Sequence, residues 1–227
     1  MDLIWIWSIV LLIPALALGV YAQVKVSVNF NRYSQIRSAR GLTGAQAARQ
    51  MLDSAGLSDV GVEVAGSRLS DHYDPRTCML TLSPDVGNSD SLAALGVAAH
   101  EAGHAMQHAE GYSAFRLRSA LVPVANIGTN LGFILFFIGL IFYRSGLLMN
   151  IGILLYAGAV LFTLVTLPVE LDASRRAMTQ LENRSILVGD ELSGAKKVLS
   201  AAALTYVAAA LMAILQLLRL VLISRSR

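Results

Sequence analysis

Cysteine is almost absent from this chain of 227 residues, which has only Cys78. A single cysteine excludes an internal disulfide and a cysteine-rich structural zinc site, and a lone thiol suits a reducing compartment. Cys78 lies in a stretch that alternates apolar with polar residues. We therefore expect it to be a small apolar residue of a β-strand.

Charge and proline are also sparse. Charged residues make up 15% of the chain, and there are five prolines, so the parts outside a membrane should be compact domains rather than linkers. The chain has 18 basic and 15 acidic residues, so its net charge is only +3. This balance gives no reason to expect nucleic acid as a partner. The chain has no G-x-x-x-x-G-K-[ST] loop, which excludes a P-loop ATPase.

Apolar residues, by contrast, make up 55% of the chain, and the mean hydropathy is +0.59, as is typical of membrane proteins. A helix needs roughly 20 apolar residues to cross the hydrocarbon core. Four runs have this length: 3–22, 121–143, 147–167 and 201–224. The first run has no basic leader and no clear cleavage site, so we interpret it as a retained anchor rather than a signal peptide.

We therefore expect a mainly α integral membrane protein with about four transmembrane helices and a small α+β subdomain. The predicted segments are a transmembrane helix (1–22), a cytoplasmic subdomain (23–120), two transmembrane helices (121–167), a cytoplasmic helical segment (168–200), and a transmembrane helix with a short tail (201–227). Fourteen of the 18 Lys and Arg residues lie in segments 23–120 and 168–200, which favours a cytoplasmic location for these two segments. Basic residues near the span ends should also attract anionic membrane lipids.

The predicted subdomain has clear start and stop signals. Thr43 and Gln46 have the spacing of a helix capping box, and Gly56 can end that helix. The stretches VGVEVAG and TCMLTLS have the alternation and length of strands, and the turn-rich SRLSDHYDPR separates them. Residues 88–90 offer N-caps for a further helix, which contains AAHEAGHAMQHAE and ends at Gly111.

This last helix carries an H-E-x-x-H motif. His100 and His104 lie one turn apart, so both imidazoles can bind the same metal ion. Glu101 lies off that stripe, where it can take a proton from a metal-bound water, as in H-E-x-x-H zinc peptidases. The alternative, polar residues on a helix face near the lipid headgroups, does not explain so specific a motif. The motif also marks the α+β subdomain as zincin-like.

A catalytic zinc ion needs a third protein ligand. His108 shares the stripe, but at i+8 it lies about 12 Å along the helix axis from His100, beyond reach of the same ion. The stretch TLPVELDASRRAM offers Glu170 and Asp172, which are about 200° apart on a helix, so only one can face the metal. We favour Glu170, while Asp172 can pair with Arg176 at i+4 on the outer helix face.

Two further features suggest how a peptide substrate could be held. Such enzymes commonly bind substrate as an added strand, and RTCMLTLS is a candidate sheet edge close to the motif helix. His72, Tyr73 and Tyr112 are candidate hydrogen-bond donors to a tetrahedral oxyanion. For each of these three residues, a role in a turn or in packing is the simpler interpretation.

The motifs together resemble the bacterial YugP-type zinc-dependent membrane metallopeptidases, a neutral zinc metallopeptidase family, over nearly the whole chain. The segments that carry the resemblance are DHYDPR, AAHEAGHAMQHAEGY, LRSALVPVANIG, LPVELDASRRAM and GAKKVLSAAALTYVAAALMAILQLLR. HEAGH also occurs in ATP-dependent FtsH-type membrane proteases, but this chain has no ATPase segment. The resemblance implies that His100 and His104 bind zinc, that Glu101 is the base and that Glu170 of VELDAS is the third ligand. The related HtpX group has E-x-x-A-D there, where this chain has E-L-D-A-S.

Three functions are compatible with these features, and the last of them is a metal-bound but inactive scaffold. The first is a zinc metalloendopeptidase of the bacterial cytoplasmic membrane, with its site facing the cytoplasm, Zn²⁺ as cofactor and membrane-associated proteins or peptides as substrates. The alternative is a metal-binding or metal-transporting membrane protein without proteolytic activity. Transport sites usually lie near the bilayer midplane in broken helices, whereas this motif lies outside the apolar runs. Glu101 would also have no task in a carrier, so we favour the peptidase.

Overall fold

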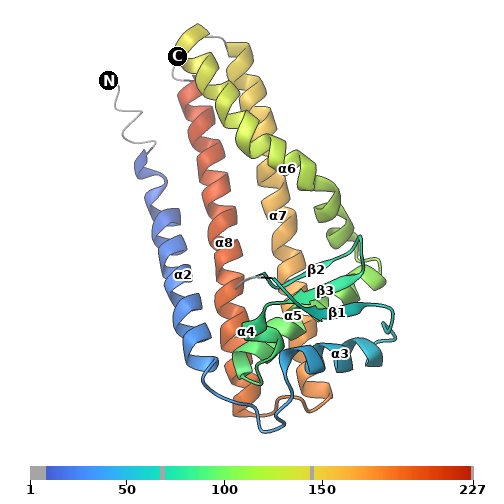
Figure 1. Ribbon diagram of the computed structural model, residues 1–227. Helices are drawn as coiled ribbons and strands as arrows, with labels where there is room; N and C mark the ends of the chain where they lie inside the picture. Colours follow the sequence, from blue (N-terminus) through green and yellow to red (C-terminus); the bar gives the residue numbers. More distant parts are fainter. Residues whose placement is uncertain (1–8, 67–69, 144–145, 226–227) are drawn as a thin grey trace. The chain divides into compact units, whose positions relative to one another are not determined.

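The computed structural model describes residues 9–66, 70–143 and 146–225, and this part of the chain is mainly helical with one small sheet (Figure 1). Its elements are α2 (Ile13–Tyr33), α3 (Gly44–Ser54), β1 (Gly61–Val64), β2 (His72–Asp74), β3 (Met79–Leu82), α4 (Pro84–Gly87), α5 (Leu92–Ala109), α6 (Ser113–Ile138), the π-helical turn η1 (Gly139–Tyr143), α7 (Gly146–Asn183) and α8 (Asp190–Arg225). The predicted fold class, mainly α with a small α+β part, is confirmed.

Four helices among the described residues are long and apolar enough to cross a membrane: Ile13–Tyr33, Ser113–Phe142, Gly146–Asn183 and Asp190–Arg225. The predicted number of spans is confirmed, and residues 3–8 of the first predicted span lie outside the described residues. Helix α7 has 38 residues, a length of about 57 Å at 1.5 Å per residue. Because a hydrocarbon core is about 30 Å thick, α7 is long enough to place its last turns outside a bilayer.

The chain divides into two compact units. Unit 1 comprises Met1–Ala22, Arg116–Pro168 and Thr205–Arg227, and unit 2 comprises Gln23–Phe115 and Val169–Leu204. In unit 1, α6 and α7 approach closely at glycines, since a Cβ on Gly128 would lie 2.3 Å from the carbonyl oxygen of Leu155. Small residues of this kind let transmembrane helices pack backbone to backbone. The assignment of each segment to a side of the membrane stays a prediction.

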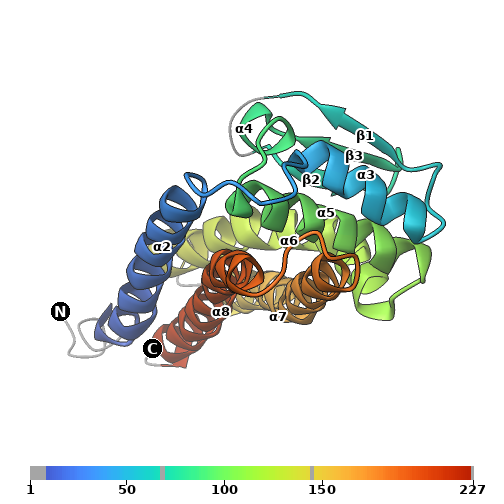
Figure 2. The same ribbon diagram turned by 90° about the horizontal axis from the view of Figure 1, so that it is seen from below.

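Helix α5 is the centre of unit 2. Thirteen of its 18 residues are buried, so it is covered on most sides rather than along one stripe. Its alanines and Leu95 share one core with Met51 of α3, Leu80 of β3 and Val169 of α7. Figure 2 shows α5 between α3 and the sheet on one side and the ends of α7 and α8 on the other. The helix that carries the motif is therefore the best supported element of this unit.

The helix ends of unit 2 follow the signals in the sequence with one difference. Thr43 and Gln46 form the predicted capping box of α3, and Gly56 follows with a φ of +75°. Helix α5 is capped by Ser91, whose side chain accepts from the amide of Ala94, so the predicted N-cap at residues 88–90 was wrong. Gly111 follows α5 with a φ of +64°, as predicted.

The sheet has three strands rather than the two predicted. Strand β2 lies within SRLSDHYDPR, which we expected to be a turn, and it pairs antiparallel with β3, Tyr73 opposite Leu80. The turn itself is shorter: the carboxylate of Asp74 accepts from the amide of Arg76 at 2.8 Å. Burial of Tyr73, which is 9% exposed, explains why these residues extend along the sheet.

Strand β3 and the turn before it contradict two expectations. Strand β3 pairs with parallel β1 on one side and with β2 on the other, so RTCMLTLS cannot offer a free edge. Cys78 does not belong to a strand but lies in the turn before β3, with a φ of +51°. A left-handed backbone is uncommon for a residue with a side chain, and here it closes the hairpin between β2 and β3.

Candidate metal centre

His100 and His104 lie on the same face of α5, one turn apart. Their ring centroids are 4.8 Å apart, with the rings edge to face. His104 is buried, and the side chain of His100 is 14% exposed. The helix therefore presents two imidazoles to one small space, as their spacing in the sequence predicts.

Glu170 of α7 completes this group. Its Oε2 lies 3.1 Å from Nε2 of His100 and 3.7 Å from Nε2 of His104, and the residue is only 2% exposed. One ligand atom from each of the three residues lies within 4.8 Å of the other two. A tetrahedral zinc with bonds of about 2.0–2.1 Å separates its ligand atoms by about 3.3 Å, so these side chains fit a shared ion. Two imidazoles and one carboxylate are also the ligand set of several catalytic zinc sites.

The second ring nitrogen of each histidine has its own partner. Nδ1 of His100 lies 3.1 Å from the hydroxyl of Ser174, and Nδ1 of His104 lies 3.0 Å from Oε1 of Gln107. Such contacts orient a metal-binding imidazole so that the opposite nitrogen faces the ion. Both rings accordingly direct Nε2 toward Glu170.

Gly103, between the two histidines, lets α7 come this close. A Cβ at this position would lie 2.6 Å from the carbonyl oxygen of Ala173, which is inside any normal contact distance. Ala173 is three residues after Glu170, so the two helices touch less than one turn from the carboxylate. The small residue in HEAGH is therefore a packing requirement of the site.

Gly103→Ala should push α7 away from α5 and weaken metal binding. Alanine normally stabilises a helix by about 1 kcal/mol relative to glycine, but overpacking of this kind costs about 1–3 kcal/mol. Gly96→Ala is the matched control, because its Cβ would meet Ala195 at an ordinary 3.5 Å. Only Gly103→Ala should have a lower melting temperature and a lower zinc affinity, the latter measured by competition with a chelator. Equal zinc affinity in the two variants would contradict this account.

Glu101 is partly exposed beside His100, and its charge influences the site. Burial lowers the pKa of His104, but a hydrogen bond with Glu170 and the charge of Glu101 raise it more, so the net pKa is above its ordinary value. Protons therefore compete for this imidazole at a higher pH than for a free one, and metal affinity should fall on acidification.

The other candidates from the sequence lie outside the group. Asp172 accepts from the guanidinium of Arg176 at 2.5 Å, the pair predicted at i+4, but Asp172 is buried and not on an outer face. His108 is held by the hydroxyl of Tyr73, 2.8 Å from its Nδ1. Burial raises the pKa of Tyr73, which keeps its hydroxyl protonated.

The two remaining candidate oxyanion donors also have other contacts. His72 is exposed, with Nδ1 2.7 Å from the carbonyl oxygen of Ser70. The ring of Tyr112 lies 5.9 Å from the guanidinium carbon of Arg176. Neither contact involves the metal group, and a turn or packing role stays the simpler interpretation of both residues.

Sequence reasoning missed Gln107 and Ser174. Each carries a signal in retrospect: Gln107 is a polar residue three positions after His104 in an apolar helix, and Ser174 is four positions after Glu170. Both spacings place the residue on the face of its helix that carries the ligand. Ser174 also stands where the E-x-x-A-D pattern has its aspartate.

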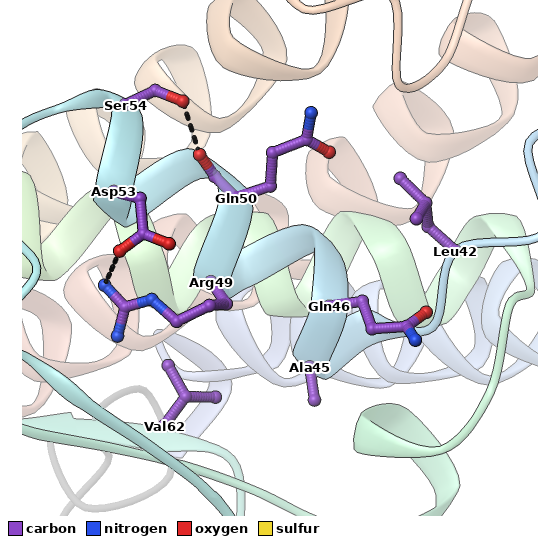
Figure 3. Close-up of a pocket in the computed structure, with 8 residues that line it drawn as sticks. All are labelled: Leu42, Ala45, Gln46, Arg49, Gln50, Asp53, Ser54 and Val62. Atoms are coloured by element: carbon purple, nitrogen blue, oxygen red, sulfur yellow. Dashed lines mark hydrogen bonds and ion pairs between the residues drawn. The ribbon is translucent and has the colours of Figure 1, made fainter.

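A hollow of about 650 Å³ elsewhere in unit 2 is not part of this site. It lies along α3 beside Val62 of β1, and Figure 3 shows Arg49 paired with Asp53 and the hydroxyl of Ser54 donating to the carbonyl of Gln50. Arg49 also donates to the carbonyl of Leu57 at 2.8 Å. These contacts tie α3 to the loop before β1, which is a structural role.

Comparison with known proteins agrees with this site. Residues 8–225 match the family described as "Putative neutral zinc metallopeptidase". The chain is 46% identical over 215 residues, 95% of both chains, to the "Putative membrane protease YugP" of Bacillus subtilis (strain 168). No solved structure matches the chain significantly. The zinc of this family fits the ligands that His100, His104 and Glu170 offer. The chain therefore belongs to the neutral zinc metallopeptidase family and is a zinc-dependent peptidase with helices that can span a membrane.

Proposed function

We propose that this protein is a multi-pass zinc endopeptidase in which His100, His104 and Glu170 hold the metal and Glu101 is the general base. One observation carries the proposal: three side chains from two distant segments offer their ligand atoms within 4.8 Å of one another. Three protein ligands leave a fourth position open, as a catalytic rather than a structural zinc requires. Among the described residues, the partly exposed side chain of Glu101 has no hydrogen-bond or ion-pair partner that would give it a structural role instead.

Each residue then has a defined task. Zinc, when bound, lowers the pKa of a coordinated water to about 7 and polarises the peptide carbonyl. Glu101 accepts the proton of the attacking water and delivers it to the leaving amine nitrogen, so it ends the cycle in the form in which it began. Ser174 and Gln107 keep the two imidazoles in place throughout.

We propose that the free edge of β2 receives the substrate backbone as an added strand. Among the described strands, β1 and β2 each have a partner on one side only, and we choose β2. It is also joined to the motif helix, because the hydroxyl of Tyr73 on β2 lies 2.8 Å from Nδ1 of His108 on α5. A peptide on this edge would be anchored to the same helix that carries Glu101.

We place the active site on the cytoplasmic side of a bacterial cytoplasmic membrane. Fourteen of 18 Lys and Arg residues lie in segments 23–120 and 168–200, which follows the positive-inside rule. Glu170 comes three residues after the apolar run 147–167. Substrates are therefore membrane-associated proteins or peptides close to the headgroups, and anionic lipids bind the basic residues near the span ends.

Vesicles of opposite orientation test activity, metal and side together. A soluble reporter peptide should be cleaved by inverted membrane vesicles that contain the protein and spared by sealed right-side-out vesicles. A chelator should abolish cleavage, and added zinc should restore it. Cleavage confined to right-side-out vesicles would reverse the orientation, and cleavage insensitive to chelation would remove the metal from the mechanism.

The alternative, a metal transporter without proteolytic activity, is not favoured. The family and the relative are both described as peptidases. The three ligand residues also belong to unit 2, and not to the apolar runs of unit 1, whereas transport sites usually lie at the bilayer midplane.

A further inference from the structure

Gln107 is a fully buried polar residue that the proposed chemistry does not use. It is 0% exposed, which is unusual for glutamine, and it lies three residues after His104 on α5. Its amide makes three contacts: Oε1 lies 3.0 Å from Nδ1 of His104, and Nε2 donates to the carbonyl of Val169 at 2.8 Å and to Oδ2 of Asp172 at 2.9 Å. Every contact thus involves a ligand or a residue within two positions of one.

The acceptors determine which way this amide points. A backbone carbonyl and a carboxylate accept hydrogen bonds but cannot donate them, so the NH₂ group must face Val169 and Asp172. The carboxylate of Asp172 also accepts hydrogen bonds from the guanidinium groups of Arg175 and Arg176. Turning the amide around would place its oxygen against two other acceptors and leave a buried donor unsatisfied. Its Oε1 therefore has to face His104.

An acceptor at this position also determines which ring nitrogen of His104 carries the hydrogen. Because Oε1 of Gln107 can only accept, Nδ1 of His104 must carry the hydrogen and donate it. In the neutral ring, Nε2 then keeps its lone pair and faces Glu170. This is the tautomer that binds a metal through Nε2.

We propose that Gln107 is a positioning residue that holds His104 in its metal-binding tautomer and joins α5 to the turn of α7 that carries Glu170. The inference rests on the proposed function, in which both residues are zinc ligands. Val169 and Asp172 lie on either side of Glu170, so one amide sets the distance between the two ligands. Asp172, which the sequence offered as a ligand, is instead the anchor of this amide.

His100 has no equivalent device. Its Nδ1 faces the hydroxyl of Ser174, which can donate or accept and so imposes no tautomer. Ser174→Ala should therefore weaken zinc binding less than a change at Gln107. The two histidines of the motif therefore differ, because the partner of Nδ1 fixes the tautomer of His104 and not that of His100.

Gln107→Leu tests the inference in the full-length purified protein. Leucine fills the same space and offers no hydrogen bond, so zinc affinity, measured by competition with a chelator, should fall about 10–100-fold. The control is Gln50→Leu, a glutamine on α3 that makes no contact with the metal group, and it should bind zinc like the wild type. His104→Ala provides the reference for loss of a ligand.

Imidazole ¹⁵N NMR of the full-length protein after zinc removal separates positioning from simple packing. In the neutral ring, His104 of the wild type should carry its hydrogen on Nδ1, and Gln107→Leu should lose this preference. The inference is overturned if Gln107→Leu binds zinc like the wild type, or if it keeps the wild-type tautomer, while His104→Ala loses the metal. Wild-type zinc binding by His104→Ala would instead refute the proposed ligand set.

Discussion

Glu101→Gln is expected to slow peptide cleavage about 10²–10⁴-fold while zinc remains bound. Glutamine has nearly the same shape as glutamate but cannot accept a proton at neutral pH. The three residues of the metal group, His100, His104 and Glu170, are unchanged in this variant. The loss should therefore appear in kcat, because the missing step is a proton transfer and not metal or substrate binding.

The matched control is Glu182→Gln, which removes the same charge from an exposed position on α7. It should leave both cleavage and zinc content at wild-type values. Zinc content and reporter cleavage need to be measured on the same preparations. If Glu101→Gln cleaves at the wild-type rate, Glu101 is not the base; if its zinc is lost, the residue contributes to the metal site.

Glu170→Ala is expected to abolish zinc binding at concentrations that saturate the wild type. Glu170 is the one group member that comes from α7, and its carboxylate lies between two imidazoles. Loss of a residue that only orients a ligand costs about 10–100-fold in affinity. Loss of a ligand should exceed the upper end of that range. The metal-to-protein ratio of purified protein measures the effect, and peptide cleavage should vanish with it.

Asp172→Ala and His108→Ala distinguish Glu170 from the other candidates. His108 contacts Tyr73 rather than the metal group, so His108→Ala should keep its zinc. Asp172 anchors Gln107, so Asp172→Ala should lose affinity but still bind zinc more tightly than Glu170→Ala. Full zinc content in Glu170→Ala, with loss in either of the other two variants, would assign the third ligand elsewhere.

Most of the expectations that agree with the structure concern short-range patterns, and the choice of Glu170 is the exception. The capping box at Thr43 and the end of α5 at Gly111 depend on backbone groups within a few residues. The four long apolar helices follow from the lengths of apolar runs. The relation of His100 to His104 follows from helix geometry alone.

Apart from the N-cap of α5, the wrong expectations mainly concern pairing between segments. Strand β2 lies in a stretch that reads locally as a turn, and only its alignment with β3 and the burial of Tyr73 make it extended. The central place of β3 depends on β1 and β2 together, because an alternating strand has the same sequence pattern at an edge and in the middle of a sheet. Cys78 was expected in a strand because it lies in the alternating stretch, but the turn between β2 and β3 includes it.

The sequence by itself therefore determined the motif, the helices and the pair of carboxylates from which a third ligand could come, because each follows from local periodicity. Only the tertiary structure decided how α7 is rotated against α5. That rotation turns Glu170 toward the two imidazoles and Asp172 toward Gln107, and the contact of Gly103 with Ala173 permits the close approach. The physical reason is that a helical repeat specifies angles within one helix, whereas packing between helices selects which angle faces the ion.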